Sequence, residues 1–260
     1  MTGERSSRRT RPSTPPSAPP PTLVDLTAPV EDYLKVIYEI ELSGSAAATN
    51  DIAHRLEIAP ASVTGMVRRL ADQGWLEYER YRGVRLTESG RRAALRTIRR
   101  HRVIEAYLVK ALGYSWDQVH PEAERLEHAA SDELIDRMAA AIGEPLTDPH
   151  GAPIPTRDGV IDETRHGSLA EMVVGAEARI VRVGDENDEL LRYVDSLGIR
   201  PGVAVVLAER APFDGPLTVR VGATEHQIGH ALAMRILVES AGGQVRTAPR
   251  AAPSTRRRDS

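Results

Sequence analysis

A stretch rich in proline and glycine divides this chain of 260 residues into two parts with different periodicity. It covers residues 147–168 and contains the run DPHGAPIP. Before it, apolar residues recur at the three- and four-residue spacing of helices, interrupted by one short extended region. After it, short runs of alternating and β-branched residues predict strands. We therefore expect a mainly α-helical part followed by a small β-rich domain, which makes an α+β chain of several domains.

The β-rich part contains four runs that predict strands, at residues 178–183, 203–209, 217–221 and 235–238. One short helix is expected at residues 188–197, and Gly198 ends it. Turn sequences such as FDGP at residues 213–216 separate the strands. Short strands closed by such turns indicate a small five-stranded β-barrel.

Composition excludes several classes of protein. The chain has no cysteine, which removes disulfides, thiolate metal sites, iron–sulfur clusters and thiol nucleophiles. No run approaches the roughly 18 apolar residues of a membrane span, and the basic start lacks the apolar stretch of a secretion signal. We expect a cytoplasmic protein that does not bind a membrane. Residues 1–22 and 241–260, rich in proline, serine, threonine and arginine, are expected to be disordered tails.

Charge is distributed unevenly, although the formal net charge is only −3. Residues 49–100 carry eleven arginines against six acidic residues, a balance of +5. Residues 101–146 carry four basic residues against nine acidic ones, a balance of −5. A basic block beside an acidic one suggests a part that binds a polyanion next to a part that binds cations. The alternative is that both blocks are only solvated faces.

Two short helices joined by a tight turn are predicted at residues 50–56 and 61–70. This is the pattern of a helix-turn-helix, whose second helix enters the major groove of DNA. The exposed side of that helix carries small side chains and cations, and the candidate DNA contacts there are Ser62, Thr64, Gly65, Arg68 and Arg69. Small groups let the helix sit deep, where a threonine methyl or a hydroxyl can reach bases or phosphates.

A β-hairpin with arginines near its tip follows the helix pair. Residues 75–80 and 84–87 alternate about a turn at 81–83. Arg80, Arg82 and Arg85 are therefore predicted to contact DNA phosphates, as the wing of a winged helix. The alternative is a hairpin whose basic face is only solvated.

A stripe of possible metal ligands is predicted on the helix that begins near residue 120. At about 100° per residue, one stripe contains His120, Glu124, Glu127 and His128. The same stripe continues as apolar residues at positions 135, 138 and 142. Charged residues seldom occupy a buried stripe unless they are paired or bind an ion. The preceding helix adds His101 and Glu105, one turn apart.

Oxygen and imidazole ligands without sulfur suit Mn(II), Fe(II), Co(II) or Zn(II). The alternative is a set of helix ion pairs with Arg102 and Arg125 that binds no metal. The histidines and glutamates could also pair with each other.

The chain resembles the diphtheria toxin repressor family of metal-dependent repressors in its three-domain form, and within it the manganese-sensing, MntR-like branch. The resemblance covers residues 27–239 and rests on the segments 30–39, 62–67, 78–87, 101–105, 120–132, 151–155 and 198–202. It implies a homodimer with a winged helix-turn-helix domain at 23–96, a helical dimerisation and metal-binding domain at 97–146, a linker at 147–168 and an SH3-like (FeoA-like) small β-barrel at 169–240.

The resemblance also implies two metal sites. The regulatory site would consist of Asp32, Glu124, Glu127 and His128. The ancillary site would consist of His101, Glu105 and His120, completed from the third domain by Asp185, Glu186 or Asp188.

Two positions separate the branches of this family. Iron-sensing members carry Cys at the position of Glu124 and often Met at that of Asp32, whereas both are carboxylates here, as in manganese sensors. Harder ligands favour Mn(II). Lys35 stands where short manganese sensors carry a second acidic residue, so a tightly coupled two-manganese cluster is not expected.

The resulting hypothesis is a manganese-dependent repressor that binds a double-stranded DNA operator and controls metal homeostasis, with manganese-uptake genes as the targets that the resemblance implies. We expect no catalytic role and no small-molecule substrate. The near alternative is an iron(II)-dependent repressor of the same architecture. An enzyme with a carboxylate-bridged metal pair would need Glu-x-x-His on two helices, and the one match, Glu163 to His166, lies in the linker. A DNA-binding protein indifferent to metal is the remaining alternative.

Overall fold

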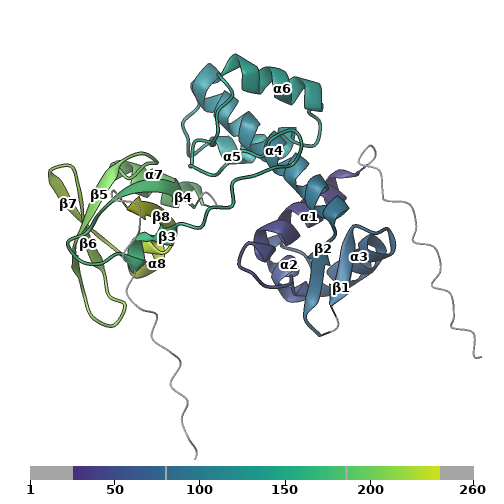
Figure 1. Cartoon of the computed structure of the whole chain (residues 1–260), viewed down its shortest axis with the longest axis horizontal. Helices are drawn as coiled ribbons and strands as arrows, with labels where there is room; N and C mark the ends of the chain where they lie inside the picture. The colour runs from purple at the N-terminus through teal and green to yellow at the C-terminus, as the bar shows by residue number, and fades with distance from the viewer. Residues whose placement is uncertain (1–25, 80, 185–186, 241–260) are drawn as a thin grey trace, which may run out of the picture. The chain divides into compact units, whose positions relative to one another are not determined.

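The structure is a computed structural model that describes residues 26–79, 81–184 and 187–240 (Figure 1). The tails expected at 1–22 and 241–260 lie outside the described residues, as do the candidate site residues Arg80, Asp185 and Glu186. The chain forms two compact units, one up to Ala93 and one from Ala94 onward. Helix α4, Glu88–Leu112, contributes to both.

The first unit is a helix-turn-helix followed by a β-hairpin. Its elements are α1 (Ala28–Glu41), α2 (Thr49–Arg55), α3 (Pro60–Asp72), β1 (Leu76–Glu79) and β2 (Gly83–Leu86). Pro60 occupies the first turn of α3, where a missing N–H leaves no hydrogen bond unmade. Apolar side chains of the three helices, among them Leu34, Ile52, Val63 and Leu70, form the buried core. Both predicted helices and the predicted hairpin are present, with ends shifted by one or two residues.

The hairpin is fixed against the loop between α1 and α2. Ala47 and Val84 exchange two backbone hydrogen bonds with N–O distances of 2.9 and 3.0 Å. Gly83 has a φ of +120°, and a Cβ atom there would lie 2.2 Å from the carbonyl oxygen of Ala47. Only glycine permits so close an approach, so this contact holds the start of β2 in place.

Three helices form the first part of the second unit: the remainder of α4, α5 (Val119–Leu126) and α6 (Asp132–Ala141). The expectation of one continuous stripe from residue 120 to 142 is wrong, because α5 ends at Leu126. Ser131 begins a new helix, and its hydroxyl accepts a hydrogen bond from the backbone N–H of Leu134 at 3.2 Å. The preference of serine for the N-terminal cap of a helix outweighs the helical spacing of apolar residues that continues past residue 128. Glu127 and His128 consequently lie in a turn between α5 and α6.

Arginines of α4 hold α6 in place. Arg96 and Arg100 both donate to Asp132, with N–O distances of 2.8 to 3.0 Å. Arg99 donates to Asp136 at 3.0 Å. Part of the acidic block therefore joins helices, which is a different role from binding a cation.

The second part of this unit is a six-stranded antiparallel sheet in the order β3-β8-β4-β5-β6-β7. Its strands are β3 (Gly167–Ser168), β4 (Glu177–Val183), β5 (Ala204–Arg210), β6 (Leu217–Val221), β7 (Thr224–Ile228) and β8 (Ile236–Ser240). The short helices are η2 (Leu169–Glu171), α7 (Asp188–Ser196) and α8 (His230–Ala233).

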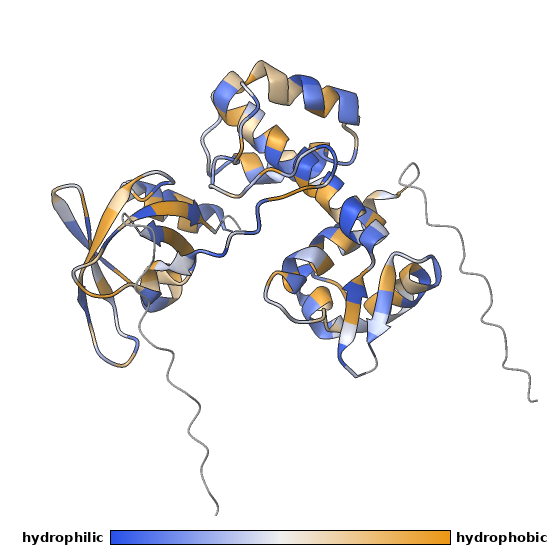
Figure 2. Cartoon of the chain, in the orientation of Figure 1, coloured by the Kyte–Doolittle hydropathy of each residue, from blue (hydrophilic) through white to orange (hydrophobic). Residues whose placement is uncertain are grey.

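The four predicted strands and the predicted helix α7 are present, but the predicted count of five strands is wrong. Strand β3 has only two residues, too few to show a pattern. Strand β7 has the sequence TEHQI, in which polar residues replace the alternation of apolar and polar residues that predicts a strand. Hydrophobic residues run along the strands (Figure 2) and form the core of this part. Trp116, from the loop between α4 and α5, is buried in the same core. Among the described residues, no helix is long and apolar enough to span a bilayer.

Candidate metal centre

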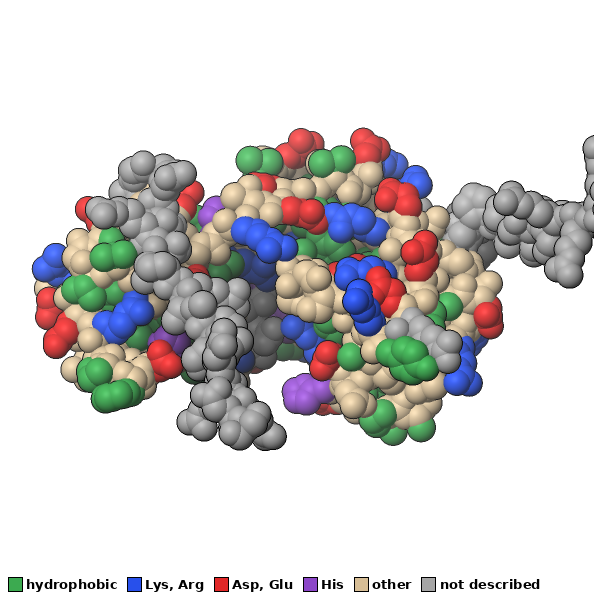
Figure 3. All heavy atoms as spheres, turned by 60° about the horizontal axis from the view of Figure 1, so that its bottom comes forward, with side chains coloured by type: hydrophobic (Ala, Val, Ile, Leu, Met, Phe, Trp, Pro, Cys, Tyr) green, Lys and Arg blue, Asp and Glu red, His purple; other side chains and the backbone are tan. Residues whose placement is uncertain are grey.

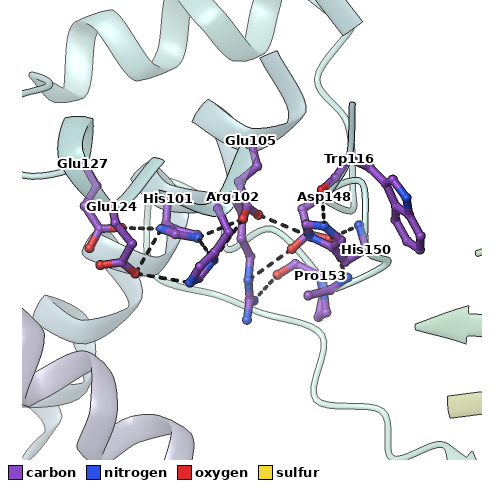
Figure 4. Close-up of polar contacts among 11 residues, drawn as sticks. His101, Arg102, Glu105, Trp116, Glu124, Glu127, Asp148, His150 and Pro153 are labelled. Carbon is purple, nitrogen blue, oxygen red and sulfur yellow. Dashed lines mark hydrogen bonds and ion pairs between the residues drawn. The ribbon is translucent and has the colours of Figure 1, made fainter. Parts of the chain in front are cut away.

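Histidine and glutamate side chains of α4 and α5 meet in the helical part of the second unit (Figure 4). Nε2 of His101 lies 3.0 Å from Oε1 of Glu105 and 3.1 Å from Nδ1 of His120. Nδ1 of His120 lies 3.3 Å from the same Glu105 oxygen. Each of the three residues offers a ligand atom within 4.8 Å of the others. The structure thus brings together the three helical residues of the expected ancillary site.

The opposite edge of the His101 ring faces two further carboxylates. Nδ1 of His101 lies 2.5 Å from Oε2 of Glu127 and 3.7 Å from Oε1 of Glu124. Nε2 of His128 lies 3.4 Å from the other oxygen of Glu127. A neutral imidazole carries one N–H and cannot donate to carboxylates on both edges. Both contacts of His101 are favourable only if the ring is protonated or a cation lies between one of its nitrogens and the facing carboxylate.

The glutamates differ in exposure. The side chains of Glu105 and Glu127 are fully buried, whereas that of Glu124 is 42% exposed. Burial raises the pKa of Glu105, but the charge and hydrogen bond of His101 and the hydrogen bond of His120 outweigh it. These neighbours hold the pKa of Glu105 well below its ordinary value. Glu105 is therefore a carboxylate anion at neutral pH, the form that can bind a cation.

Two residues that the sequence analysis placed only in the linker complete a second buried group. Asp148 and His150 lie beside Glu105, and the three offer ligand atoms within 4.8 Å of one another. Nε2 of His150 lies 2.8 Å from the carbonyl oxygen of Trp116, which can only accept, so the ring proton belongs on Nε2. The lone pair of Nδ1 then faces Oε2 of Glu105 at 3.8 Å.

That second group has the chemistry of a cation site. Oε2 of Glu105 is buried and has no hydrogen-bond partner among the described residues. An acceptor nitrogen facing an ionised oxygen is unfavourable in a buried place unless a proton or a cation lies between them. The residues present thus fit a divalent metal ion bound by oxygen and imidazole nitrogen. The signal in the sequence was the Asp-x-His spacing within DPHGAPIP.

The two arginines weighed as ion-pair partners of the ligand stripe bond elsewhere. Arg102 donates to the carbonyl oxygen of Pro153 at 2.5 Å and lies 3.6 Å from Asp148. Arg125 donates to the carbonyl oxygen of Pro121 and pairs with Glu122 at 3.0 Å. These contacts do not favour the interpretation in which the histidines and glutamates only form ion pairs with these arginines.

The remaining predicted ligands lie in other elements. Asp32 is half-buried on α1 of the first unit. Lys35, also on α1, is buried. Asp188 is half-buried and is the first residue of α7.

The residues predicted to contact DNA are exposed on α3. Ser62, Thr64, Gly65, Arg68 and Arg69 all face solvent, while Val63, Val67 and Leu70 of the same helix are buried. The hydroxyl of Thr64 donates to the carbonyl oxygen of Pro60 at 3.1 Å, within the same helix.

In the hairpin, Arg82 is exposed and Arg85 is half-buried in an ion pair with Glu79 at 2.8 Å. On the face of the molecule seen in Figure 3, basic and acidic side chains are interspersed.

Three family profiles match the chain. Residues 25–84 match "Iron dependent repressor, N-terminal DNA binding domain", residues 87–156 match "Iron dependent repressor, metal binding and dimerisation domain", and residues 167–240 match "FeoA domain". The iron-dependent repressor IdeR of Mycobacterium tuberculosis is 32% identical over 230 residues, which is 84% of this chain and 98% of that protein.

Solved structures of related proteins are also similar. A manganese-dependent transcriptional repressor in complex with manganese superposes with a TM-score of 0.75 at 37% identity, over 81% of this chain and 99% of the other. ScaR with bound Zn²⁺ superposes with a TM-score of 0.72 at 30% identity, over 81% and 99% of the two chains.

Proposed function

The chain belongs to the diphtheria toxin repressor family of metal-dependent, DNA-binding transcriptional repressors, and we propose that manganese is the ion that activates it. At the level of the family, it has a DNA-binding domain, a dimerisation and metal-binding domain and a FeoA domain, and it is a repressor, not an enzyme. We also propose domain boundaries at 23–96, 97–146 and 169–240, and a homodimer as the form that binds an operator.

The donor set supports manganese. The ligand candidates are carboxylates and imidazoles, and the chain has no cysteine that could add a soft thiolate. Relatives divide on this point, because IdeR is an iron-dependent repressor and the repressor with 37% identity is manganese-dependent. Hard oxygen ligands suit Mn(II) better than the softer divalent ions of the same series.

The single observation that carries the proposal is that several buried carboxylate oxygens and imidazole nitrogens, all able to accept hydrogen bonds, lie close together. The carboxylates of Glu105 and Glu127 are fully buried, and Oε2 of Glu105 has no hydrogen-bond partner among the described residues. A bound divalent cation supplies the positive charge that lets such carboxylates share one site.

We propose two functional sites built from these residues. The regulatory site uses Asp32 from α1 together with Glu124, Glu127 and His128, so that one ligand belongs to the DNA-binding domain. The second site uses His101, Glu105 and His120, with Asp148 and His150 from the linker. Asp185, Glu186 or Asp188 would complete it from the third domain.

The regulatory mechanism follows from charge. Without a cation, Asp32 is repelled by Glu124 and Glu127, and the DNA-binding domain has no fixed position. When those carboxylates are held together, the two recognition helices of a dimer are set about 34 Å apart, one helical turn of DNA. A shift from 1% to 99% of the competent arrangement requires about 5.5 kcal/mol of differential binding.

The experiment is a gel shift with fragments of the native genome under three conditions: EDTA, Mn(II), and Fe(II) held anaerobically. Manganese activation predicts that specific fragments are retained with Mn(II) and released by EDTA. Equal or stronger retention with Fe(II) would assign the chain to the iron-responsive branch. Retention unaffected by EDTA would mean that the histidine and glutamate groups are structural.

A matched pair of variants tests the regulatory site. Glu124→Ala should abolish metal-dependent retention while the dimer persists in analytical ultracentrifugation. Glu122→Ala, on the same helix but paired with Arg125, should behave as the native chain. An unchanged manganese requirement in Glu124→Ala would contradict the assignment of the ligands.

A further inference from the structure

The tip of the β1–β2 hairpin places a tyrosine in an unusual backbone conformation. Tyr81 has a φ of +67°, and 88% of its surface is exposed. A bulky side chain in the left-handed region is a genuine outlier, because its Cβ approaches the backbone carbonyl. Glycine or asparagine would adopt this conformation with less strain.

The strain persists because the hairpin is held on both sides of its tip. On one side, Gly83 is pressed against Ala47, and Val84 is bonded to the same residue. Across the turn, the N–H of Arg82 donates to the carbonyl oxygen of Glu79 at 3.0 Å. Strained residues that an anchored framework holds in place are characteristic of binding sites. An aromatic ring that is almost fully exposed adds little to the packing of its own domain.

Three observations indicate DNA as the partner of this tip. The tip of the hairpin lies within the DNA-binding profile, residues 25–84. It continues directly from the recognition helix, since the N–H of Trp75 donates to the carbonyl oxygen of Leu70 at 2.9 Å. Arginines stand on both sides of Tyr81 in the sequence. A tyrosine between cations suits a sugar–phosphate backbone, because its ring packs on deoxyribose and its hydroxyl donates to a phosphate.

We propose that Tyr81 is a DNA contact of the wing, packed against the backbone of the duplex beside the groove that α3 enters. This proposal rests on the proposed DNA-binding role and adds an uncharged contact to the arginines of the hairpin.

A second hairpin in the molecule shows why the flanking residues matter. Phe213, between β5 and β6, is 99% exposed with a φ of +59°. Its neighbour is Asp214, and its ring has no hydroxyl. A carboxylate beside the ring is unsuited to a phosphate backbone, and no such role is assigned to that tip.

The test measures affinity for two duplexes by fluorescence anisotropy: an operator fragment with Mn(II), and a duplex of arbitrary sequence at low salt. Tyr81→Ala should weaken binding to both about five- to tenfold, and Tyr81→Phe about two- to threefold, since only one hydrogen bond is lost. The slope of log affinity against log salt should stay unchanged, because no charge is removed. Tyr78→Ala is the matched control, since Tyr78 is 66% exposed on β1 without backbone strain.

A third variant separates binding from folding. Tyr81→Gly should raise the melting temperature or leave it unchanged, because the strain is relieved, and should still weaken DNA binding as much as Tyr81→Ala does. Native affinity in Tyr81→Ala or Tyr81→Gly would overturn the proposal. The duplex of arbitrary sequence needs no metal response, so a failure of manganese activation would leave this comparison of Tyr81 variants intact.

Discussion

On α3 the side chains predicted to contact DNA are exposed, and the buried face of the same helix is apolar, with Val63, Val67 and Leu70 at most 4% exposed. On α4 and the turn after α5, the predicted metal ligands are themselves buried, with Glu105 and Glu127 at 0% exposure. In the first region, the side chains proposed to bind DNA are not those that form the core. In the second, the carboxylates proposed to bind a cation are themselves part of the buried interior, so substitutions should have different consequences in the two regions.

The largest effect is expected at Glu127. Native protein with Mn(II) at 100 times its dissociation constant should gain about 2.7 kcal/mol of stability. Glu127→Ala should lose most of that gain, because it removes a proposed metal ligand whose buried carboxylate contacts His101 and His128. The measurement is the melting temperature over a manganese titration.

Glu133→Ala is the control for Glu127→Ala. The side chain of Glu133 is 76% exposed and pairs with Arg137 on α6. Its replacement should leave the manganese-dependent rise in melting temperature intact. A native rise in melting temperature with manganese in Glu127→Ala would contradict the proposal that buried carboxylates of this region bind the cation.

A smaller effect is expected at Asp132, which joins α6 to Arg96 and Arg100. Burial raises the pKa of Asp132, but the hydrogen bonds and charges of these two arginines outweigh it, and the pKa lies below its ordinary value. A lowered pKa in the folded state stabilises the fold above the ordinary value of about 3.9, and this contribution is lost as pH falls through the lowered value.

Asp132→Asn should therefore cost about 1 kcal/mol at pH 7, since the group is partly exposed, and nothing in strong acid. Urea unfolding at several pH values measures this. The rise in melting temperature with manganese should be the same as in the native chain. A variant that lost this rise would place Asp132 with the metal ligands, contrary to the role given to it here.

The smallest effect on stability is expected at Gly65, within the exposed side of α3. A Cβ atom there would meet nothing within 4 Å, so Gly65→Ala should stabilise the helix by about 0.5–1 kcal/mol. Binding to the operator should weaken, because the methyl group would hinder close approach to the groove. Thermal unfolding and anisotropy measure the two quantities, and tighter binding in this variant would contradict a role for Gly65 at the interface.

Elements that depend on residues close together in the sequence were predicted, and elements that depend on contacts between distant residues were missed. The helix-turn-helix, the hairpin and four strands follow from local periodicity, and the fold class is confirmed. The break between α5 and α6 was missed because a stripe calculation assumes one uninterrupted helix, whereas Ser131 caps a new one. Strand β7 was missed because its polar residues are paired with β6, a contact that no local pattern reports.

The candidate site shows the same limit. His101, Glu105 and His120 were predicted from helical spacing, and the structure brings them together. Asp148 and His150 were not, because they reach Glu105 through the path of an irregular segment. The backbone N–H groups of His150 and Ala152 both donate to Asp148 at 2.9 Å, which shapes that segment into a fixed turn.

The tryptophan between α4 and α5 has a consequence for how the chain can be divided. Trp116 is 5% exposed within the core of the FeoA domain, Arg200 of that domain lies over its ring, and Asp117 pairs with Arg192 at 3.3 Å. Part of the core of the barrel is thus formed by a residue that precedes it by some fifty positions. Cutting the chain in the linker would leave a cavity in the core of the FeoA fragment and would expose the Trp116 side chain of the other fragment to water. The segment that folds as one unit therefore includes more of the chain than the domain boundary in the linker suggests.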